Sequence, residues 1–414
     1  MYDVVRKDAS SMAIYQALRV GGVHPETAAL ANILAEQGVV APHSGRPFSE
    51  ALLLGIGGGI GGGYFVFEFT GCPKALVIGA RHQWHQTDLF LTGICERLGM
   101  PLTIRETTSA KAAATHLRAA LDAGRRAIAW VDLAGLPYVQ APSDWERCWI
   151  HVAGVVGADD AAGELLLDDR GPVPWRIDAE TFAAARAAIR SNKHRLMLVE
   201  APPAAIELER AVVAGLRAGV DGLQDPPIKN FGIAAFEKWA SLIADRKNKK
   251  GWPAVFRPGP DLLRALAATF HAVETNGTGG GALRPLFADF LDDAAGILRV
   301  PGLGDVAARY RELGAAWTAF AEAALPDAVP TLGETRHLLQ EKERLTLARG
   351  ADAIDDLSRI NGRLRALEAS AETAHPLSEP ESLDLFAALR DRLEDIAREE
   401  RAAVAELASA IDGL

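Results

Sequence analysis

A pair of prolines, Pro202-Pro203, divides the chain into two regions with different patterns. Before it, short apolar segments at residues 75–79, 101–106 and 126–133 alternate with helical segments, which predicts mixed α and β structure. After it, apolar residues recur at helical spacing almost to the C-terminus, and a double proline continues neither a helix nor a central strand. The sequence therefore predicts an α+β protein, with an N-terminal α/β domain followed by an all-helical C-terminal domain.

The length of 414 residues exceeds what one hydrophobic core usually organises. We expect domains at residues 1–202 and 203–330, and a long helical hairpin at 331–414 built from about 332–372 and 381–411. Two paired helices alone would cover the apolar stripe of the hairpin poorly, which predicts a homodimer contact. The stripe consists of Leu338, Leu339, Leu345, Leu347, Ile354, Leu357, Ile360 and Leu364.

Charge and cysteine content exclude several classes of partner. The 54 acidic residues outnumber the 44 basic ones, so we expect no nucleic-acid binding, and the basic cluster at 246–250 reads as a solvated loop. Cys72, Cys95 and Cys148 have no C-x-x-C spacing and an odd count, which is typical of a cytoplasmic protein. We expect no secretory signal in the first eleven residues and no membrane span.

The segment His24-Pro25-Glu26-Thr27 begins a helix that we expect to end near Gly38. Free backbone N–H groups and the helix dipole favour negative charge at such a terminus. His24 and Glu26 are therefore candidate catalytic residues, and Pro25 and Thr27 are candidate substrate contacts. The alternative is that His24 caps the helix and Glu26 only interacts with its dipole.

A predicted hairpin joins a strand at residues 149–156 to one at 164–167. It would place the imidazole of His151 opposite a carboxylate, Asp168 or Asp169, which would hold the imidazole in one tautomer. Asp168 and Asp169 both remain candidates at this point. Cys148 is a poor nucleophile beside His151, because strand alternation points it to the opposite face.

Two glycine-rich segments are candidate substrate contacts. The first, residues 55–63, has seven glycines in nine positions, which predicts irregular backbone beside a substrate channel, and a strand with Tyr64 and a buried Glu68 follows it. The second, residues 277–281, precedes Arg284 and suits an anion such as a pantetheine phosphate. Neither has the lysine of a nucleotide-binding loop, so no cofactor is expected. The candidates are Gly57, Gly58, Gly59, Tyr64, Glu68, Glu274, Thr278, Gly279 and Arg284.

Several of these segments together resemble a known family. The runs GGVHPETAALANILAEQGV, PFSEALLLGIGGGIGGGYFVFEF, IHVAGVVGADD and LLLDDRGPVPWRIDAETFAAARAAI resemble the N-terminal domain of the butirosin biosynthesis protein H family and, more distantly, papain-like peptidases that process bacteriocins. PPIKNFGIAAFEKWA and VETNGTGGGALRPLFADFLDDAA are similar to the helical domain that follows it in relatives. The resemblance covers residues 15–325 and implies a papain-like N-terminal domain. It also favours Asp169 over Asp168, because Asp169 aligns better with the residue that ends the strand in papain-like relatives.

The resemblance implies an acyltransferase that moves an acyl group from a carrier-protein thioester to an amine. The family pattern implies cysteine after the motif histidine, where this chain has Pro25, so covalent cysteine catalysis is excluded there.

Three functions remain. In the first, His151 acts as general base, without a covalent intermediate, while the helix terminus stabilises the oxyanion. In the second, the protein only binds a small molecule or a partner.

In the third, His24, Glu26 and His151 bind a metal or form a new acid–base set. The segment 81–85, followed by Asp88, also has ligand spacing, but two histidines and one acid on a surface segment are usually not a site. We therefore expect no metal site at residues 81–88, and metal binding by His24, Glu26 and His151 stays an alternative.

Overall fold

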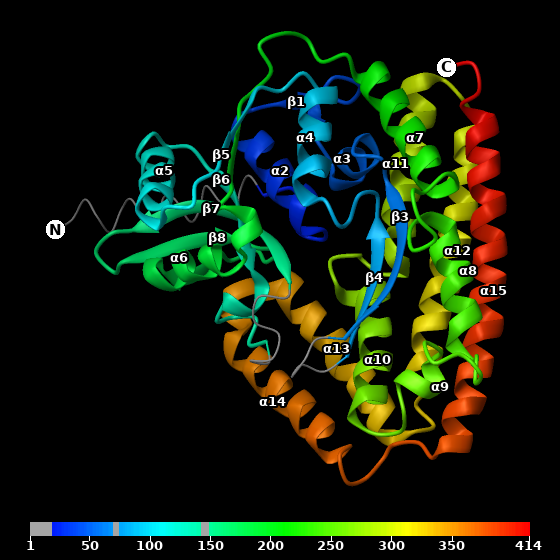
Figure 1. The fold of residues 1–414 in the computed structure, drawn as a ribbon. Helices are drawn as coiled ribbons and strands as arrows, with labels where there is room; N and C mark the ends of the chain where they lie inside the picture. The colour runs from blue at the N-terminus through cyan, green and yellow to red at the C-terminus, as the bar shows by residue number, and fades with distance from the viewer. Residues whose placement is uncertain (1–18, 69–73, 142–148) are drawn as a thin grey trace. The chain divides into compact units, whose positions relative to one another are not determined.

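The computed structural model describes residues 19–68, 74–141 and 149–414, which form two compact units (Figure 1). Unit 1 consists of the described residues up to Glu50, Leu98–Glu207 and Arg344–Arg359. Unit 2 consists of Ala51–Arg97, Leu208–Glu343 and Ile360–Leu414. The predicted order, an α/β region followed by a largely helical one, is confirmed. Each unit nevertheless combines segments that are far apart in the sequence.

Unit 1 is built on a six-stranded antiparallel sheet with the strand order β5-β10-β6-β7-β8-β9. The central strands β6 and β10 are buried along their whole length, as their apolar runs AIAWV and LMLV predict. The predicted hairpin is present, and its first strand is longer than expected. The strands are β5 Leu102–Arg105, β6 Ala127–Asp132, β7 Ile150–Asp159, β8 Glu164–Asp168, β9 Trp175–Asp178 and β10 Leu196–Val199.

Three helices of unit 1 pack on this sheet: α2 (Pro25–Glu36), α5 (Ala110–Asp122) and α6 (Ala179–Ala188). Helix α2 is buried along nearly its whole length, because its sequence is apolar on every face. Gly154 of β7 lies against this helix, since a Cβ built on it would make an ordinary contact, at 3.7 Å, with the Cβ of Ala29 in α2. A short ribbon of β1 (Val40–Ala41) and β2 (Arg46–Pro47) follows α2.

Unit 2 is a helical assembly with a two-stranded ribbon, β3 (Ile60–Phe67) and β4 (Ala75–Arg81). Its core holds stacked and edge-on aromatic rings, including Trp239, Trp252 and Trp317. Its helices are α4 Thr87–Arg97, α7 Leu208–Gln224, α8 Gly232–Ile243, α9 Trp252–Val255, α10 Pro260–Phe270, α11 Arg284–Leu298, α12 Gly302–Ala324 and α15 Glu379–Ala410. Helix α3 (Glu50–Ile56) begins in unit 1, and α13 (Pro330–Arg349) and α14 (Ile354–Ser370) also contribute residues to both units.

The first glycine-rich segment is more regular than its composition predicts. Gly57, Gly58 and Gly59 form a turn after α3, with positive φ at the last two, but Gly61–Gly63 belong to strand β3. A Cβ on Gly62 would lie 2.2 Å from the carbonyl oxygen of Gly232. The prediction of an irregular segment is therefore wrong for its second half, because glycine there admits a neighbouring backbone.

The C-terminal helices also differ from the predicted hairpin. Residues 332–372 are not one helix, because a 3₁₀ turn at Gly350–Ala353 separates α13 from α14. Helix α15 packs against α8 and α12 within unit 2. None of the stripe residues behind the predicted dimer is exposed, and Leu345, Leu357 and Ile360 are buried. The other five residues of the stripe are half-buried, so the stripe is partly covered within the chain, and the homodimer stays a prediction.

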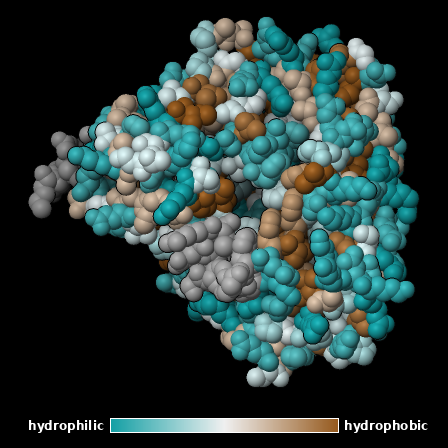
Figure 2. Space-filling model, viewed as in Figure 1, coloured by the Kyte–Doolittle hydropathy of each residue, from teal (hydrophilic) through white to brown (hydrophobic). Residues whose placement is uncertain are grey.

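The helices in the described part of the chain include no candidate for a membrane-spanning segment. No helix of these residues combines the length and the apolar character that crossing a bilayer requires. Hydrophilic side chains cover most of the face seen in Figure 2, with apolar areas scattered between them.

Candidate functional site

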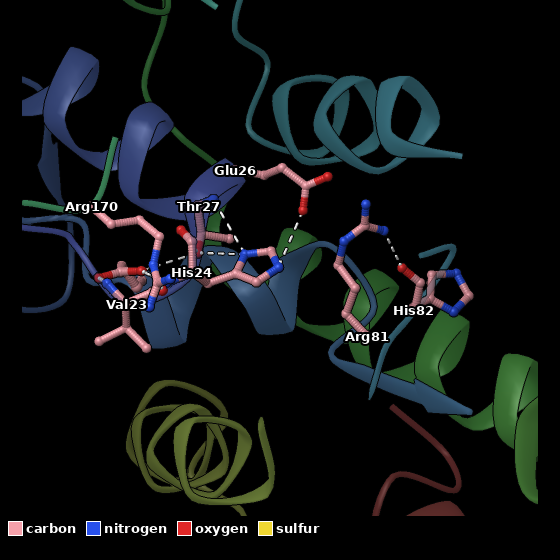
Figure 3. A network of polar contacts seen from close by, with 8 residues as sticks. Val23, His24, Glu26, Thr27, Arg81, His82 and Arg170 are labelled. Carbon is pink, nitrogen blue, oxygen red and sulfur yellow. Dashed lines mark hydrogen bonds and ion pairs between the residues drawn. The ribbon is translucent and has the colours of Figure 1, made fainter. Parts of the chain in front are cut away.

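The N-terminus of α2 is satisfied by its own side chains (Figure 3). Pro25 occupies the first turn, where its missing N–H costs nothing. His24 is the N-cap, and its Nδ1 accepts from the backbone N–H of Thr27 at 3.5 Å. Its Nε2 lies 3.1 Å from the carboxylate of Glu26. Both ring nitrogens of His24 thus have partners in the first turn of the helix that it caps.

Glu50, at the start of α3, is a site residue that the sequence analysis missed. Its buried carboxylate accepts three backbone N–H groups, from Gly22 at 2.6 Å, Val23 at 2.9 Å and His24 at 2.7 Å. Pro25 itself has no N–H group to offer an oxyanion. Glu50 thus occupies the N–H groups that precede Pro25, and oxyanion stabilisation at the terminus of α2 stays a prediction. A lone acid directly before the apolar run ALLLG was the available signal.

His151 and Asp169 form a hydrogen-bonded pair. The Nε2–H of His151 donates to Asp169 Oδ2 at 2.9 Å, and the hydroxyl of Tyr138 donates to the same oxygen at 2.8 Å. This arrangement leaves the Nδ1 lone pair of His151 available as a base. The His151 side chain is 15% exposed, whereas that of Asp169 is 7% exposed. The pair is thus anchored in the protein interior and reachable from outside at the imidazole.

The electrostatics of this pair keep Asp169 ionised. Burial by itself would raise the pKa of the Asp169 carboxyl, but the charge of His151 and the hydrogen bonds from His151 and Tyr138 outweigh burial and hold the pKa below its ordinary value. Burial, together with the Asp169 charge, raises the pKa of Tyr138 well above its ordinary value. Tyr138 therefore remains a donor and Asp169 an acceptor at neutral pH.

Asp168 has a different environment from its neighbour. It accepts from the side-chain amide of Asn32 in α2 at 2.8 Å. The carbonyl oxygen of the same Asn32 side chain accepts from the backbone N–H groups of Val20 and Gly21, at 2.8 and 2.9 Å. Asp168 thus connects strand β8 to α2 and to the segment before it, whereas Asp169 contacts the imidazole.

The loop after β8 is held on several sides. The side chain of Arg170, which has a φ of 67°, donates to the carbonyl oxygen of Val23 at 2.8 Å. The indole N–H of Trp175 donates to the Asp169 carbonyl oxygen at 3.0 Å, and its ring stacks on Tyr138. Gly350 approaches the same loop, since a Cβ on Gly171 would lie 2.3 Å from the Cα of Gly350. The position of Asp169 is therefore fixed by backbone contacts as well as by its side chain.

The candidate residues of the first glycine-rich segment belong to unit 2 and pack internally. A Cβ on Gly57, Gly58 or Gly59 would collide with the rings of Phe90, His82 or Phe287, respectively. Tyr64 is buried in the aromatic core, and its hydroxyl oxygen accepts from the Trp252 indole at 3.0 Å. Glu68, predicted to be buried, is exposed and lies 3.9 Å from Lys74. These glycines therefore serve close packing with aromatic rings.

The candidates around the second glycine-rich segment also have internal partners. Glu274 accepts from the Gly281 N–H at 3.0 Å and from the Thr318 hydroxyl at 2.7 Å. Thr278 is buried and donates to a backbone carbonyl, while Gly279 supplies a positive φ in the turn.

Arg284 is fully buried and is paired with Glu400 at 2.7 Å, so its guanidinium does not face an anion site. We do not include these residues in the proposed site.

The alternative sites receive no support from the described residues. Among them, no three His, Cys, Asp or Glu side chains lie close enough together to hold a metal ion. Burial is the main cause that lowers the pKa of His82 to about 4, followed by the nearby Arg97. Cys95 is buried, and burial raises the pKa of its thiol to about 12. Cys72 and Cys148 lie outside the described residues.

Comparisons with known proteins agree with the sequence resemblance. Residues 24–170 match the family model described as butirosin biosynthesis protein H, N-terminal. Residues 180–341 match a model described as a domain of unknown function, DUF4872. The search of curated proteins returned no significant match. The first match begins at His24 and ends at Arg170, so it contains both the terminus of α2 and the His151–Asp169 pair. The chain therefore contains an N-terminal domain of the butirosin biosynthesis protein H family, followed by a DUF4872 domain.

Proposed function

We propose that this protein transfers an acyl group from a thioester to an amine or to water, with His151 as general base and Asp169 as its orienting acid. The observation that carries the proposal is the His151–Asp169 pair, in which Asp169, itself bound by the Tyr138 hydroxyl, accepts from Nε2 and leaves Nδ1 available. The N-terminal domain of the butirosin biosynthesis protein H family supports a role in secondary metabolism. The three cysteines without disulfide spacing support a cytoplasmic location.

In the proposed step, Nδ1 of His151 takes a proton from the acceptor as its nitrogen or oxygen attacks the thioester carbonyl. The new C–N or C–O bond forms, the C–S bond breaks, and the imidazolium returns the proton to the departing thiolate. Asp169 stabilises the imidazolium while it exists. Pro25 cannot accept the acyl group, so no acyl-enzyme forms at α2.

Replacement of the general base tests this mechanism. His151→Asn should slow turnover of an N-acetylcysteamine acyl thioester by about a hundred- to ten-thousand-fold, the usual contribution of a positioned base. His43→Asn makes the same chemical change at an exposed turn residue of unit 1 and should leave the rate unchanged. Rates are measured with several amine acceptors, and intact-protein mass is recorded in parallel. A wild-type rate in His151→Asn, or a stable acyl adduct on any cysteine, would exclude the mechanism.

A second function, binding without catalysis, is favoured by the terminus of α2. There Pro25 offers no nucleophile and the carboxylate of Glu50 already occupies the N–H groups of residues 22–24. A protein that only binds its ligand needs neither a nucleophile nor free N–H groups at this terminus. If the wild-type protein turns over none of the thioesters but binds one saturably in calorimetry, this second function replaces the first.

A further inference from the structure

A cavity of about 260 Å³ lies in unit 1 between α5, α6 and the β7–β8 hairpin. Its walls are mostly apolar and include Ala113, Leu117, Leu165 and Phe182. The lining residues all belong to unit 1. His151 lies eight residues before Asp159 on β7, so the cavity is roughly 25 Å along the strand from the proposed base. The cavity is therefore separate from the proposed catalytic site.

One buried cation lines this apolar cavity. Arg186 of α6 is 3% exposed, and its guanidinium donates to two backbone carbonyls, those of Ala113 at 3.3 Å and His194 at 2.5 Å. Its Nε has no hydrogen-bond partner among the described residues. No carboxylate of the described residues forms an ion pair with it, and burial lowers its pKa to about 10. A buried charge without a counter-ion is costly, which makes an anionic ligand favourable here.

The acidic residues at the rim of the cavity do not neutralise Arg186, because other arginines pair with them. Arg118 forms a bidentate pair with Asp160, whose second contact measures 2.9 Å. Arg176 lies 3.2 Å from Asp159 and 3.1 Å from Glu164. His194 also lines the cavity, and burial, together with the charge of Arg186, lowers its pKa, so its ring is neutral at pH 7. The uncompensated charge facing the cavity is thus that of Arg186.

We propose that this cavity binds a small organic carboxylate with an apolar body, with the carboxylate on Arg186 and the body between α5 and α6. Guanidinium is the side-chain group best suited to a carboxylate, and the apolar walls suit a hydrocarbon. A cavity of 150 Å³ accommodates benzene, so this one accommodates about ten non-hydrogen atoms. The ligand class is therefore a medium-chain fatty acid or an acid of similar size. This site is independent of the proposed acyl transfer.

Calorimetry of the full chain with octanoate tests the proposal. Octanoate combines a hydrocarbon chain of the right size with a carboxylate. 1-Octanol has the chain without the charge, and acetate has the charge without the chain. We expect octanoate to bind at least tenfold more tightly than either. Equal binding of octanoate and 1-octanol, or no binding of octanoate, would overturn the proposal.

Variants separate the ligand role of Arg186 from its role in holding two carbonyls. Arg186→Met should weaken octanoate binding at least tenfold, whereas Arg190→Met, the same change at an exposed neighbour, should not. Ala183→Phe fills the cavity from α6 and leaves Arg186 in place, so it should abolish binding even if Arg186→Met fails to fold. Thermal unfolding without ligand checks the fold of each variant. Unchanged octanoate affinity in Ala183→Phe would place the ligand elsewhere and refute the assignment.

Discussion

Asp168 and Asp169 are adjacent and have the same side chain, but they have different partners. Strand alternation sends consecutive side chains in different directions, so Asp168 meets Asn32 while Asp169 meets His151. The sequence predicted a histidine–aspartate pair and left two aspartates open. The choice depends on the bend after β8 and on Tyr138, neither of which a local pattern reveals.

Glu50 illustrates the same point for the terminus of α2. We predict that Glu50→Gln lowers the free energy of unfolding by about 1–3 kcal/mol, because the amide keeps only one acceptor oxygen for three N–H groups. Chemical denaturation measures the change. Glu180→Gln, at an exposed acid in the first turn of α6, serves as the matched control and should change stability by less than about 0.5 kcal/mol. Equal effects of the two substitutions would show that Glu50 acts only through helix electrostatics.

The break between α13 and α14 shows how an element can be shaped by its neighbour. Helical periodicity runs through residues 332–372, so the sequence predicts one helix there. The structure interrupts it at Gly350, whose φ is 53°, and the backbone of Gly350 contacts the loop that carries Asp169. Glycine is required because a Cβ at this position would lie 2.5 Å from the Val173 carbonyl oxygen.

We therefore predict that Gly350→Ala destabilises unit 1 and slows any reaction that depends on His151. The strained backbone and the collision with Val173 should together cost about 1–3 kcal/mol. Gly362→Ala is the control, because a Cβ there meets nothing within 4 Å and replaces glycine inside helix α14. It should be neutral or stabilise the protein by up to about 1 kcal/mol. Thermal unfolding measures the stability of both variants. If Gly350→Ala is as stable as the wild-type protein, the loop does not need this contact.

The assembly of unit 2 depends on a buried ion pair between distant segments. Arg284 of α11 and Glu400 of α15 are both fully buried, and the Trp317 indole donates to the same Glu400 oxygen at 2.8 Å. The Arg284 guanidinium also donates to the carbonyl oxygen of Gly61 in β3, at 3.3 Å. Helix α15 is therefore part of the core of unit 2 and not an appended hairpin.

We predict that Glu400→Gln destabilises the protein by about 3–5 kcal/mol, because it leaves the Arg284 charge buried without a counter-ion. Glu399→Gln removes a neighbouring exposed partner of Arg309 and should cost less than about 1 kcal/mol. Denaturant midpoints compare the two. A chain ending at Pro330 lacks Glu400 altogether and should not unfold cooperatively. Cooperative unfolding of that shortened chain would show that α15 is dispensable.

The sequence by itself determined the order of α/β and helical regions, most strand and helix positions and the family, because periodicity, capping and motifs are local properties. It also predicted that His151 pairs with one of two consecutive aspartates, Asp168 or Asp169. Only the tertiary structure decided that Asp169 is the partner, that Glu50 occupies the α2 terminus and that Arg186 lines a cavity. Those outcomes depend on tertiary contacts between residues that are far apart in the sequence, and no short segment predicts such contacts.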